Sequence, residues 1–586
     1  MIFLFDLIAF LVVLTVPGYL LVDRHFQGLE KAVLSVFLSL AVTSFLFYAV
    51  VSFFGISKEF IYAYAFLLLI VFFVIKKPKI NRIFDSIKKV KLIVSPLKSE
   101  KIPELLLLFL LVLFLSLTAF FIPINKTISY DDSSYHLPII NDVAVDGQKT
   151  FFSETHNIYQ VRSNQFPLLF ESFVGTTKFF LGSFFYWLVS FFSLIISLFL
   201  IYFISKEVGY NQFFSLILYG LTPLVLLYTG YFGVENFLSL FFLGAVFFVL
   251  KYVKSENLFF VVVAGFLAGL MFLTKFTGGI FFAGLFLFLL YKHKFKPAFL
   301  FGLIFVLVSL VFFVSHLGVP FDQISVGNYG NILSDNPLIQ IFPNIFWAGN
   351  WLIYYFSDNT YILLVPVLFV FGLFLRKQKE NDFLVLFLIS LILFLGITFI
   401  NNATPTRSGF PRYFLPIYSL LCVFSGFQLK KLVELKNKKI SLFFTVFFVL
   451  MLLLISLPFM NQFNIKSNGK SFVYVGKGIE NDSNITAWFL NNAGLQVKLD
   501  KAVVYDYVWR ADFSGNPCEF LKEHKINYIV YYRIDNDPDF LSGSPDYLGD
   551  FGPKLRESLL NNDCSELIST SDPSNNALTF KIIHAK

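Results

Sequence analysis

Two adjacent carboxylates, Asp131 and Asp132, lie in a polar stretch that follows the apolar run 104–123. Neighbouring side chains on a helix diverge by about 100°, so the two carboxylates are suited to different tasks. One could act as a general base on a hydroxyl or amine, and the other could orient that group or bind a divalent cation. The simpler alternative is a solvated loop that contains two Asp.

Three basic residues next to apolar runs could bind phosphate. Lys275 ends the run 258–274, where a lone ammonium suits a lipid phosphate, although a snorkelling lysine is the alternative. Arg407 and Arg412 lie in and just after a short polar segment, and Arg binds phosphate through two parallel hydrogen bonds. Ordinary anchoring at the membrane interface is the competing interpretation of this Arg pair.

An acid, Glu235, opens the apolar run 235–252. Ionisable residues at membrane helices are often functional, but a helix N-terminus also stabilises a carboxylate by itself. Both interpretations of Glu235 therefore stay open. Further candidates for substrate binding are Tyr135, His136, Arg162, Gln165 and Tyr413.

The composition predicts an α-helical polytopic membrane protein. The 586 residues are 57% hydrophobic and only 14% charged, and the mean hydropathy is +0.72. Ordinary soluble domains carry about 25% charged residues. A transmembrane helix needs roughly 20 apolar residues, and about 14 runs approach that length. They are 2–22, 32–54, 59–75, 104–123, 184–204, 212–230, 235–252, 258–274, 277–291, 297–316, 359–375, 383–400, 413–428 and 441–460.

Basic residues follow every odd-numbered run, and the alternate loops contain few of them. The largest cluster, nine Lys and Arg between positions 76 and 101, follows the third run. By the positive-inside rule these loops are cytoplasmic, so both termini and the loop 124–183 are expected outside. The net charge of +8 therefore reflects membrane orientation, and we expect membrane lipids but no nucleic acid as partners.

Three regions are expected along the chain. Residues 1–103 hold three spans and the basic loop, 104–460 hold the remaining spans with the long outer loop 124–183, and 461–586 are polar. Within the outer loop, 135–145 and 166–180 could form amphipathic helices at the interface.

The polar region 461–586 is expected to be a small extracytoplasmic α/β domain. The pattern predicts strands at 472–475, 502–507 and 526–532, and helices at 485–492 and 518–524. Cys518 and Cys564 could form a disulfide there, or remain two free thiols.

Together these residues resemble the GT-C superfamily of polytopic glycosyltransferases. Within it, the chain is similar to the family-39 type, which includes protein O-mannosyltransferases and the aminoarabinose transferase of lipid A. The matching stretches are 130–138, 164–169, 269–278 and 412–416, all between about 104 and 430. The chain has Asp-Asp where the family commonly has Asp-Glu. It also has three spans before the helix with which the family usually begins.

The resemblance implies transfer of a sugar from a polyprenyl-phosphate donor to a protein, glycan or lipid acceptor, on the outer face of the membrane. Asp131 would be the base in an inverting attack, and Asp132 would position the acceptor or assist a metal. Lys275 and Arg412 would neutralise the lipid phosphate. A divalent cation is a possible cofactor, and no nucleotide-binding motif is present.

Two other functions fit the composition. A transporter or flippase of lipid-linked glycans would need charged or broken helices near the membrane midplane, and the apolar runs are almost free of charge. A non-catalytic scaffold would display the domain 461–586. The abundance of Phe, Ile, Lys and Asn suggests an AT-rich prokaryotic genome, and hence the plasma membrane.

Overall fold

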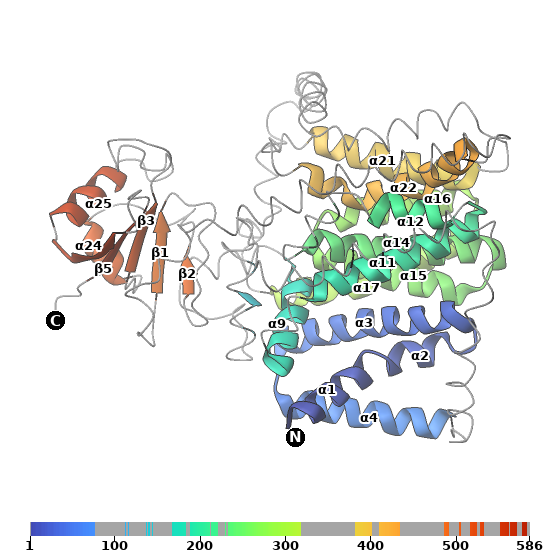
Figure 1. The fold of residues 1–586 in the computed structure, drawn as a ribbon, viewed down its shortest axis with the longest axis horizontal. Coiled ribbons are helices and arrows are strands. Elements are labelled where there is room, and N and C mark those ends of the chain that lie inside the picture. Colours follow the sequence, from blue (N-terminus) through green and yellow to red (C-terminus); the bar gives the residue numbers. More distant parts are fainter. Residues whose placement is uncertain are drawn as a thin grey trace.

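The structure is a computed structural model. It describes residues 2–76, 167–182, 188–210, 212–220, 233–317, 381–400, 410–433, 486–490, 503–505, 516–523, 528–532, 551–561, 563–570 and 577–582, together with 112, 115, 136, 139, 140, 143, 225 and 229. A helical bundle forms one part of the described chain and a small sheet with two helices forms the other (Figure 1).

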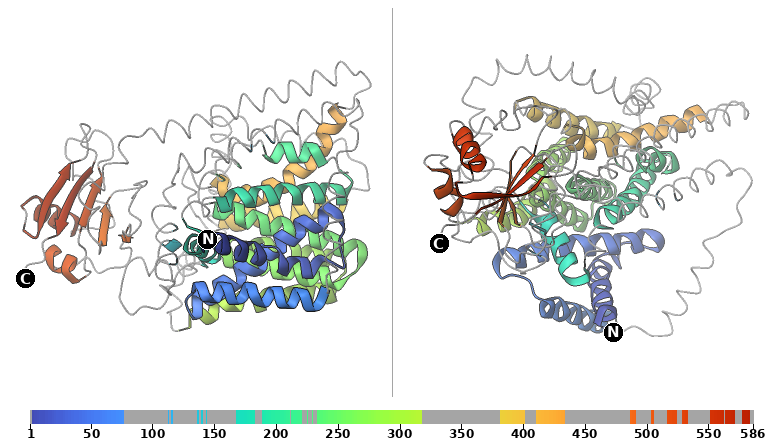
Figure 2. Two further views of the ribbon diagram at one scale, coloured as in Figure 1. Left: turned by 60° about the horizontal axis from the view of Figure 1, so that its bottom comes forward. Right: turned by 60° about the vertical axis from the view of Figure 1, so that its left-hand side comes forward.

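The described helices of the bundle run from the N-terminal region to residue 433. They are α1 (Ile2–Val13), α2 (Val16–Val22), α3 (Gly28–Phe53), α4 (Lys58–Lys76), α9 (Leu169–Leu181), α11 (Leu188–Val208), α12 (Gln212–Gly220), α14 (Val234–Ser255), α15 (Leu258–Thr274), α16 (Gly278–Tyr291), α17 (Phe295–Ser315), α21 (Asn381–Ile400) and α22 (Phe410–Val433). Figure 2 shows most of them lying side by side, with α9 at one end.

Several of these helices are long and apolar enough to cross a membrane, which confirms the polytopic fold. Within the described residues, six segments reach full length: Leu4–Val22, Gly28–Phe53, Lys58–Ile75, Leu188–Val208, Val234–Ser255 and Phe295–Ser315. Shorter apolar helices include Leu258–Thr274 and Gly278–Tyr291. The expected spans 104–123, 359–375 and 441–460 lie outside the described residues or are described at only two positions.

Helix α14 is the core of the bundle. Nearly all of its residues are buried, and it packs against α11, α15 and α22. Its aromatic rings interlock with those of neighbouring helices, as in the contact of Phe242 with Phe281 on α16, with centroids 4.9 Å apart. By contrast, α4 lies at the periphery and exposes Phe66 and Val74. A helix that is apolar on its outward face is suited to contact lipid.

The first expected span, 2–22, is divided into α1 and α2 by a short break at Leu14 and Thr15. Pro17 lies in the first turn of α2, where its missing N–H removes no helical hydrogen bond. Gly18 then lies directly against α3. A Cβ at this position would meet the Ser35 carbonyl oxygen at 2.0 Å. The close approach of α2 to α3 therefore depends on glycine.

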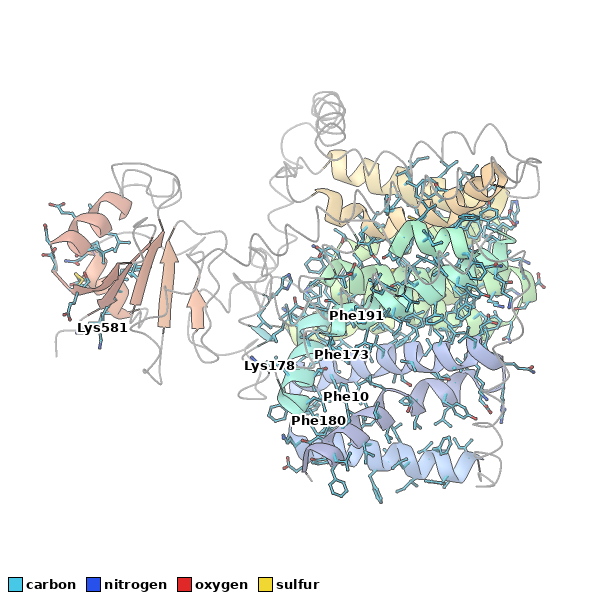
Figure 3. The ribbon with its side chains drawn as sticks, viewed as in Figure 1. Phe10, Phe173, Lys178, Phe180, Phe191 and Lys581 are labelled. Atoms are coloured by element: carbon cyan, nitrogen blue, oxygen red, sulfur yellow. A yellow bond between two sulfur atoms is a disulfide. The ribbon has the colours of Figure 1, made fainter. Side chains whose placement is uncertain are left out.

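The expected helix at 166–180 is present as α9, but it is not a one-sided amphipathic helix. Most of its residues are buried, including Glu171 and Thr177, because it packs against α3, α1 and α15. Phe173 on α9 stacks on Phe47 of α3, and Phe180 contacts Phe10 of α1 (Figure 3). Of the expected helix at 135–145, four residues are described, each in helical conformation.

The C-terminal region holds a five-stranded mixed sheet in the order β2-β1-β3-β5-β4. The strands are β1 (Thr486–Leu490), β2 (Val503–Tyr505), β3 (Tyr528–Tyr532), β4 (Ser565–Thr570) and β5 (Ala577–Ile582). β1 runs parallel to β2 and β3, whereas β5 is antiparallel to β3 and β4. Helices α24 (Pro517–Glu523) and α25 (Phe551–Leu560) accompany the sheet. In Figures 1 and 2 the sheet lies beyond the end of the bundle where α9 lies.

One secondary-structure prediction in this region is wrong. Residues 485–492 were expected to be helical, but Thr486–Leu490 form β1, between two parallel neighbours. A central parallel strand is apolar on both faces, so it lacks the alternation that marks a strand and can be mistaken for a helix segment. The strands at 502–507 and 526–532 and the helix at 518–524 are confirmed within a few residues. The strand at 472–475 lies outside the described residues.

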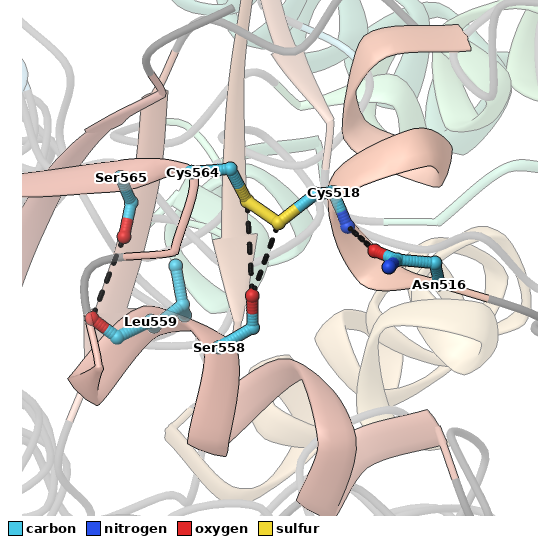
Figure 4. The surroundings of a disulfide bond; sticks show 6 residues. All are labelled: Asn516, Cys518, Ser558, Leu559, Cys564 and Ser565. Carbon is cyan, nitrogen blue, oxygen red and sulfur yellow. Dashed lines mark hydrogen bonds between the residues drawn. A yellow bond between two sulfur atoms is a disulfide. The ribbon is translucent and has the colours of Figure 1, made fainter. Parts of the chain in front are cut away.

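Cys518 and Cys564 form a disulfide that joins α24 to the start of β4 (Figure 4). Asn516 caps α24 by accepting a hydrogen bond from the Cys518 backbone N–H at 2.8 Å. The Ser558 hydroxyl of α25 lies 3.1 Å from Cys518 Sγ. The disulfide therefore sits at the point where both helices and the sheet meet. Of the two alternatives for these cysteines, the disulfide is confirmed.

We expect the substitution Gly18→Ala to destabilise the bundle by about 3 kcal/mol, because overpacking against rigid backbone cannot be relieved by side-chain motion. Thermal stability of the detergent-solubilised protein, followed by size-exclusion chromatography, measures the change. Gly302→Ala is the matched control, since its added Cβ would meet only the Phe286 ring, at 3.4 Å. Equal stability of the two variants would contradict the role assigned to Gly18.

We expect the double substitution Cys518→Ser with Cys564→Ser to destabilise the C-terminal domain by about 3 kcal/mol. Pulse proteolysis of the full chain in increasing urea measures the loss, read from fragments of residues 461–586. Reduced wild type should show the same loss, whereas Cys422→Ala, which removes the buried free thiol of α22, should leave the domain midpoint unchanged. An unchanged midpoint in the double variant would contradict the prediction.

Candidate functional site

Lys275 and Glu235 form an ion pair at one end of the bundle. The pair joins the beginning of α14 to the end of α15, which are antiparallel neighbours, and Lys275 Nζ lies 2.9 Å from Glu235 Oε1. The Glu235 side chain is buried, and the Lys275 side chain is 21% exposed to solvent. Both residues were predicted to bind substrate, and the structure brings them together. The lysine is thus placed at the membrane edge by a counter-charge rather than by snorkelling alone.

The turn after α15 holds Lys275 in place. It occupies only residues 275–277, because Gly278 begins α16 directly against α15. A Cβ on Gly278 would lie 2.3 Å from the Met271 carbonyl carbon, so the turn requires glycine. The Lys275 backbone N–H still donates to the Met271 oxygen at 3.0 Å. These contacts fix the direction in which the lysine leaves the helix.

The beginning of α14 is also held on its other side. The backbone N–H of Gly233 donates to Ser190 Oγ of α11 at 2.9 Å, and Asn236 donates to the Thr229 hydroxyl at 2.9 Å. The N-terminal end of a helix carries a partial positive charge, which stabilises the nearby Glu235 carboxylate. The helix end and Lys275 together therefore compensate a buried acid.

A second polar pair joins the segment before α9 to α9 itself. His136 Nδ1 is hydrogen-bonded to Glu171 Oε1, and both residues are buried. His136 was predicted as a substrate-binding residue, whereas Glu171 was missed. A signal for it was present, because Glu171 is the only charged residue in the stretch 168–174. An acid at such a position in an apolar helix needs a partner.

The two pairs lie at the same end of the bundle. Phe170, next to Glu171, contacts the ring of Phe237, two residues beyond Glu235, with centroids 5.4 Å apart. Phe173 of α9 stacks on the same ring at 5.9 Å. Ring packing between α9 and α14 thus connects the acid–histidine pair with the acid–lysine pair.

Each of the other predicted site residues either has only its backbone described or lies outside the described residues. Arg412 and Tyr413 lie in the first turn of α22, where only the backbone is described. Asp131, Asp132, Tyr135, Arg162, Gln165 and Arg407 lie outside the described residues. No group of three His, Cys, Asp or Glu side chains suited to a metal occurs in the described part of the chain. The possible role of Asp131 and Asp132 in binding a cation therefore stays a prediction.

Ion pairs of a different kind occupy the opposite end of the helices. Lys251 lies 2.8 Å from Glu207 and 3.2 Å from Glu30, which joins α14 to α11 and α3. Lys294 donates to Glu256 between α14 and α17, and this hydrogen bond lowers the pKa of the Glu256 carboxyl. These pairs involve the basic residues that the sequence assigns to the cytoplasmic side. The Lys275 pair lies at the end that the same rule assigns to the outside.

Comparisons with known proteins agree with this architecture. The family model described as dolichyl-phosphate-mannose-protein mannosyltransferase matches residues 179–318, a stretch that contains both Glu235 and Lys275. The solved structure of ArnT from Cupriavidus metallidurans bound to undecaprenyl phosphate matches with a TM-score of 0.51 at 12% identity. That match covers 81% of this chain and 97% of ArnT.

The apo structure of the same ArnT also matches, at 12% identity and a TM-score of 0.46, over 80% of this chain and 97% of ArnT. No curated protein matches the chain in sequence. The family model and the structure of the ArnT complex confirm the resemblance to GT-C proteins that the motifs predict.

We expect Lys275→Met to destabilise the protein by about 2 kcal/mol, because it leaves a buried carboxylate without its cation. The double variant Glu235→Gln with Lys275→Met should regain most of that loss. Thermal unfolding in detergent measures the cycle. The more exposed pair Lys292–Asp382, also at 2.9 Å, is the matched control and should show coupling below about 1 kcal/mol. If the destabilisations caused by the Glu235 and Lys275 substitutions simply added up in the double variant, the pairing would be contradicted.

Proposed function

We propose that the chain is a membrane glycosyltransferase that moves a sugar from a polyprenyl-phosphate donor to an acceptor at the outer face of the membrane. The observation that carries the proposal is the position of Lys275. Its ammonium is held beside Glu235 at the end of the bundle where His136, four residues beyond Asp132, also lies. In this proposal Lys275 supplies the cation for the phosphate, and the acidic pair, four residues before His136 in the sequence, serves the acceptor.

The donor in this proposal carries its sugar on a lipid phosphate. Lys275 binds the phosphate, and Arg412, in the first turn of α22, assists it. As the glycosidic bond breaks, negative charge builds on the leaving phosphate, and cations placed there stabilise the transition state. ArnT, whose fold is similar, has been solved with undecaprenyl phosphate bound. Glu235 keeps Lys275 oriented, and the phosphate shares the ammonium when the donor binds.

The acidic pair performs the acid–base chemistry. Asp131 takes the proton of an acceptor hydroxyl or amine, which then attacks the anomeric carbon from the face opposite the phosphate and inverts it. Asp132 positions the acceptor or helps to hold a divalent cation. Tyr135, Arg162, Gln165, Arg407 and Tyr413 contact the sugar or the acceptor. The acceptor is a protein, a glycan or a lipid.

The outer side of the membrane is the proposed location of this chemistry. The disulfide Cys518–Cys564 supports it, because structural disulfides form and persist in oxidising compartments. The sheet that contains this disulfide lies beyond the end of the bundle that carries Lys275. In this proposal the domain 461–586 faces the same compartment as the site, where it can contact the acceptor or cover the bound donor. The plasma membrane of a prokaryote fits this arrangement.

The distribution of buried charge favours transfer over translocation. Within the described residues, the buried Asp, Glu and His side chains are Asp6, His136, Glu171, Glu235 and His316. By the alternation of the helices, each lies near the predicted outer end of the bundle. A pathway across the membrane would instead require polar groups near the midplane.

Transfer of radiolabelled sugar from extracted polyprenyl-phosphate sugars, in membranes that express each variant, tests the proposal. Wild type should transfer above an empty-vector control. Asp131→Asn should lose about 10²-fold or more in rate because the base is removed, and Lys275→Met about 10²-fold because the leaving phosphate loses a cation. The control is Lys254→Met, which removes a lysine that pairs with Glu207 at the opposite end of the bundle and should transfer like wild type.

Two results would contradict the assignment. Retained transfer in Asp131→Asn, Asp132→Asn and the double variant would exclude the acidic pair as the reacting groups. Translocation of lipid-linked sugar in sealed vesicles, without any transfer by wild type, would identify a transporter.

A further inference from the structure

The segment that follows the acidic pair touches α9 at two points one helical turn apart. His136 contacts Glu171, and seven residues further along Val143 contacts Gly175. Between them, Ile139 and Ile140 are also buried. Residues four apart on a helix lie on the same face, so Glu171 and Gly175 present one continuous strip to this segment.

The first contact is a hydrogen bond inside the protein. The Glu171 residue is 2% exposed, and its second oxygen, Oε2, has no hydrogen-bond partner in the structure as described. The Tyr48 hydroxyl of α3 is buried close to Glu171, together with Ser52 and Ser315. Leaving a buried carboxylate without a donor is costly, so Oε1 holds the imidazole firmly. An ionised carboxylate only accepts hydrogen bonds, so with Glu171 in that form the His136 Nδ1–H donates to Oε1, and this bond orients the His136 ring.

The second contact depends on the absence of a side chain. A Cβ on Gly175 would lie 2.6 Å from Val143 Cβ and 3.0 Å from the Ile140 carbonyl oxygen. Either distance is shorter than an ordinary contact, so any larger residue would push the segment away from α9. Glycine costs helix stability at an interior position, which makes close approach the physical reason for it here.

Helix α9 is itself fixed to the rest of the site. Its Phe173 stacks on Phe47 of α3 and on Phe237 of α14, and α14 begins with the residues that hold Lys275. A residue four positions from His136 can move no further than about 14 Å from it, because an extended chain spans at most about 3.6 Å per residue. Anchoring His136 to α9 therefore confines Asp132 to within about 14 Å of His136.

We propose that Glu171 and Gly175 are positioning residues that clamp the segment after Asp132 onto α9, and that His136 serves as the anchor through Nδ1 rather than as a contact to substrate. This inference rests on the proposed sugar transfer for its kinetic consequences. Its structural content is independent of that transfer, because it concerns the placement of the segment. The previous assignment of His136 to substrate binding is replaced by this one.

The hydrogen bond is tested by pairs of variants that keep or remove it. Glu171→Gln keeps an oxygen that accepts from Nδ1–H, whereas Glu171→Ala does not. His136→Asn places an amide N–H near the position of Nδ1, whereas His136→Gln extends toward Nε2. We expect Glu171→Ala and His136→Gln to lower kcat by about 10²-fold, with the KM for the lipid donor unchanged, because a misplaced base slows the reaction without affecting donor binding.

The two conservative variants, Glu171→Gln and His136→Asn, should stay within about tenfold of wild type. The double variant Glu171→Ala with His136→Gln should be no slower than either single one, because both act through one bond. The matched control is Glu207→Ala, which removes a carboxylate at the opposite end of the bundle and should leave kcat and KM unchanged. Equal loss in Glu171→Gln and Glu171→Ala, or better activity in His136→Gln than in His136→Asn, would overturn the anchor.

The steric contact is tested by adding a methyl group on the α9 side and removing the valine side chain on the other side. Gly175→Ala should lower kcat by about tenfold, and adding Val143→Gly should restore most of the loss because the space is returned. Gly302→Ala controls for the effect of alanine in a helix. Failure of the paired change to restore activity, with both proteins folded by size-exclusion chromatography, would count against the clamp.

A measurement without catalysis separates this inference from the proposed function. Ser134→Cys introduces a thiol beside the acidic pair, while the native cysteines are buried or disulfide-bonded. An impermeant maleimide should label this thiol about tenfold faster in the Glu171→Ala background than in the Glu171→Gln background, because the released segment opens more often. Equal labelling rates would overturn the clamp. Absence of sugar transfer by wild type would refute the proposed function and leave this measurement valid.

Discussion

Carboxylates inside an apolar bundle need a cation or a hydrogen-bond donor, and this need ties the helices to one another at their ends. Glu235 pairs with Lys275, Glu171 pairs through one of its two oxygens with His136, and Glu207 at the opposite end pairs with Lys251. An unpaired charge in such surroundings would lower the stability of the fold by several kcal/mol. Each pair therefore fixes the axial position of one helix relative to its neighbour. The packing between the two ends can then remain apolar and aromatic without losing its register.

Glycines supply the close approach that these pairs require. On α15, a Cβ at Gly269 would lie 2.5 Å from Val308 Cβ, and one at Gly265 would lie 2.8 Å from the Phe301 carbonyl oxygen. Helix α17 therefore lies directly on the backbone of α15. Because α15 also packs on α14, the end of α15 brings Lys275 beside Glu235. Close packing between α15 and α17 thus helps to position the Lys275–Glu235 ion pair at the end of the bundle.

The parts of the fold that depend on composition and period could be predicted from the sequence. The run 258–274 coincides with α15, since its length and apolar character leave no other stable state in a bilayer. The predicted candidates Glu235 and Lys275 are 40 positions apart, and their pairing is fixed by the antiparallel packing of α14 and α15, which no local pattern reveals. The strand Thr486–Leu490 was mistaken for a helix because its apolar residues 487–490 are consecutive and show no alternation.

Glu171 illustrates what local reasoning omits. Its partner, His136, lies 35 positions away, and the residues between them belong to the long loop predicted at 124–183. The acid could have been recognised as unusual in an apolar helix, but its partner could not have been named. Gly175 likewise looks like an ordinary helix glycine until Val143 is placed against it. Contacts that join a loop to a distant helix are a property of the folded chain.

The order of strands in the C-terminal sheet determines when that domain can be completed. β5, the final strand, lies between β3 and β4, so β4 reaches the sheet only through it. A polypeptide that terminates before Ala577 would leave Tyr528–Tyr532 as an unpaired edge and β4 without a neighbour. Exposed strand edges of this kind are prone to pair with other chains. Ribosomal synthesis must therefore run through β5 before the sheet can close, and a stop codon before Ala577 would yield an aggregation-prone product rather than a slightly shortened one.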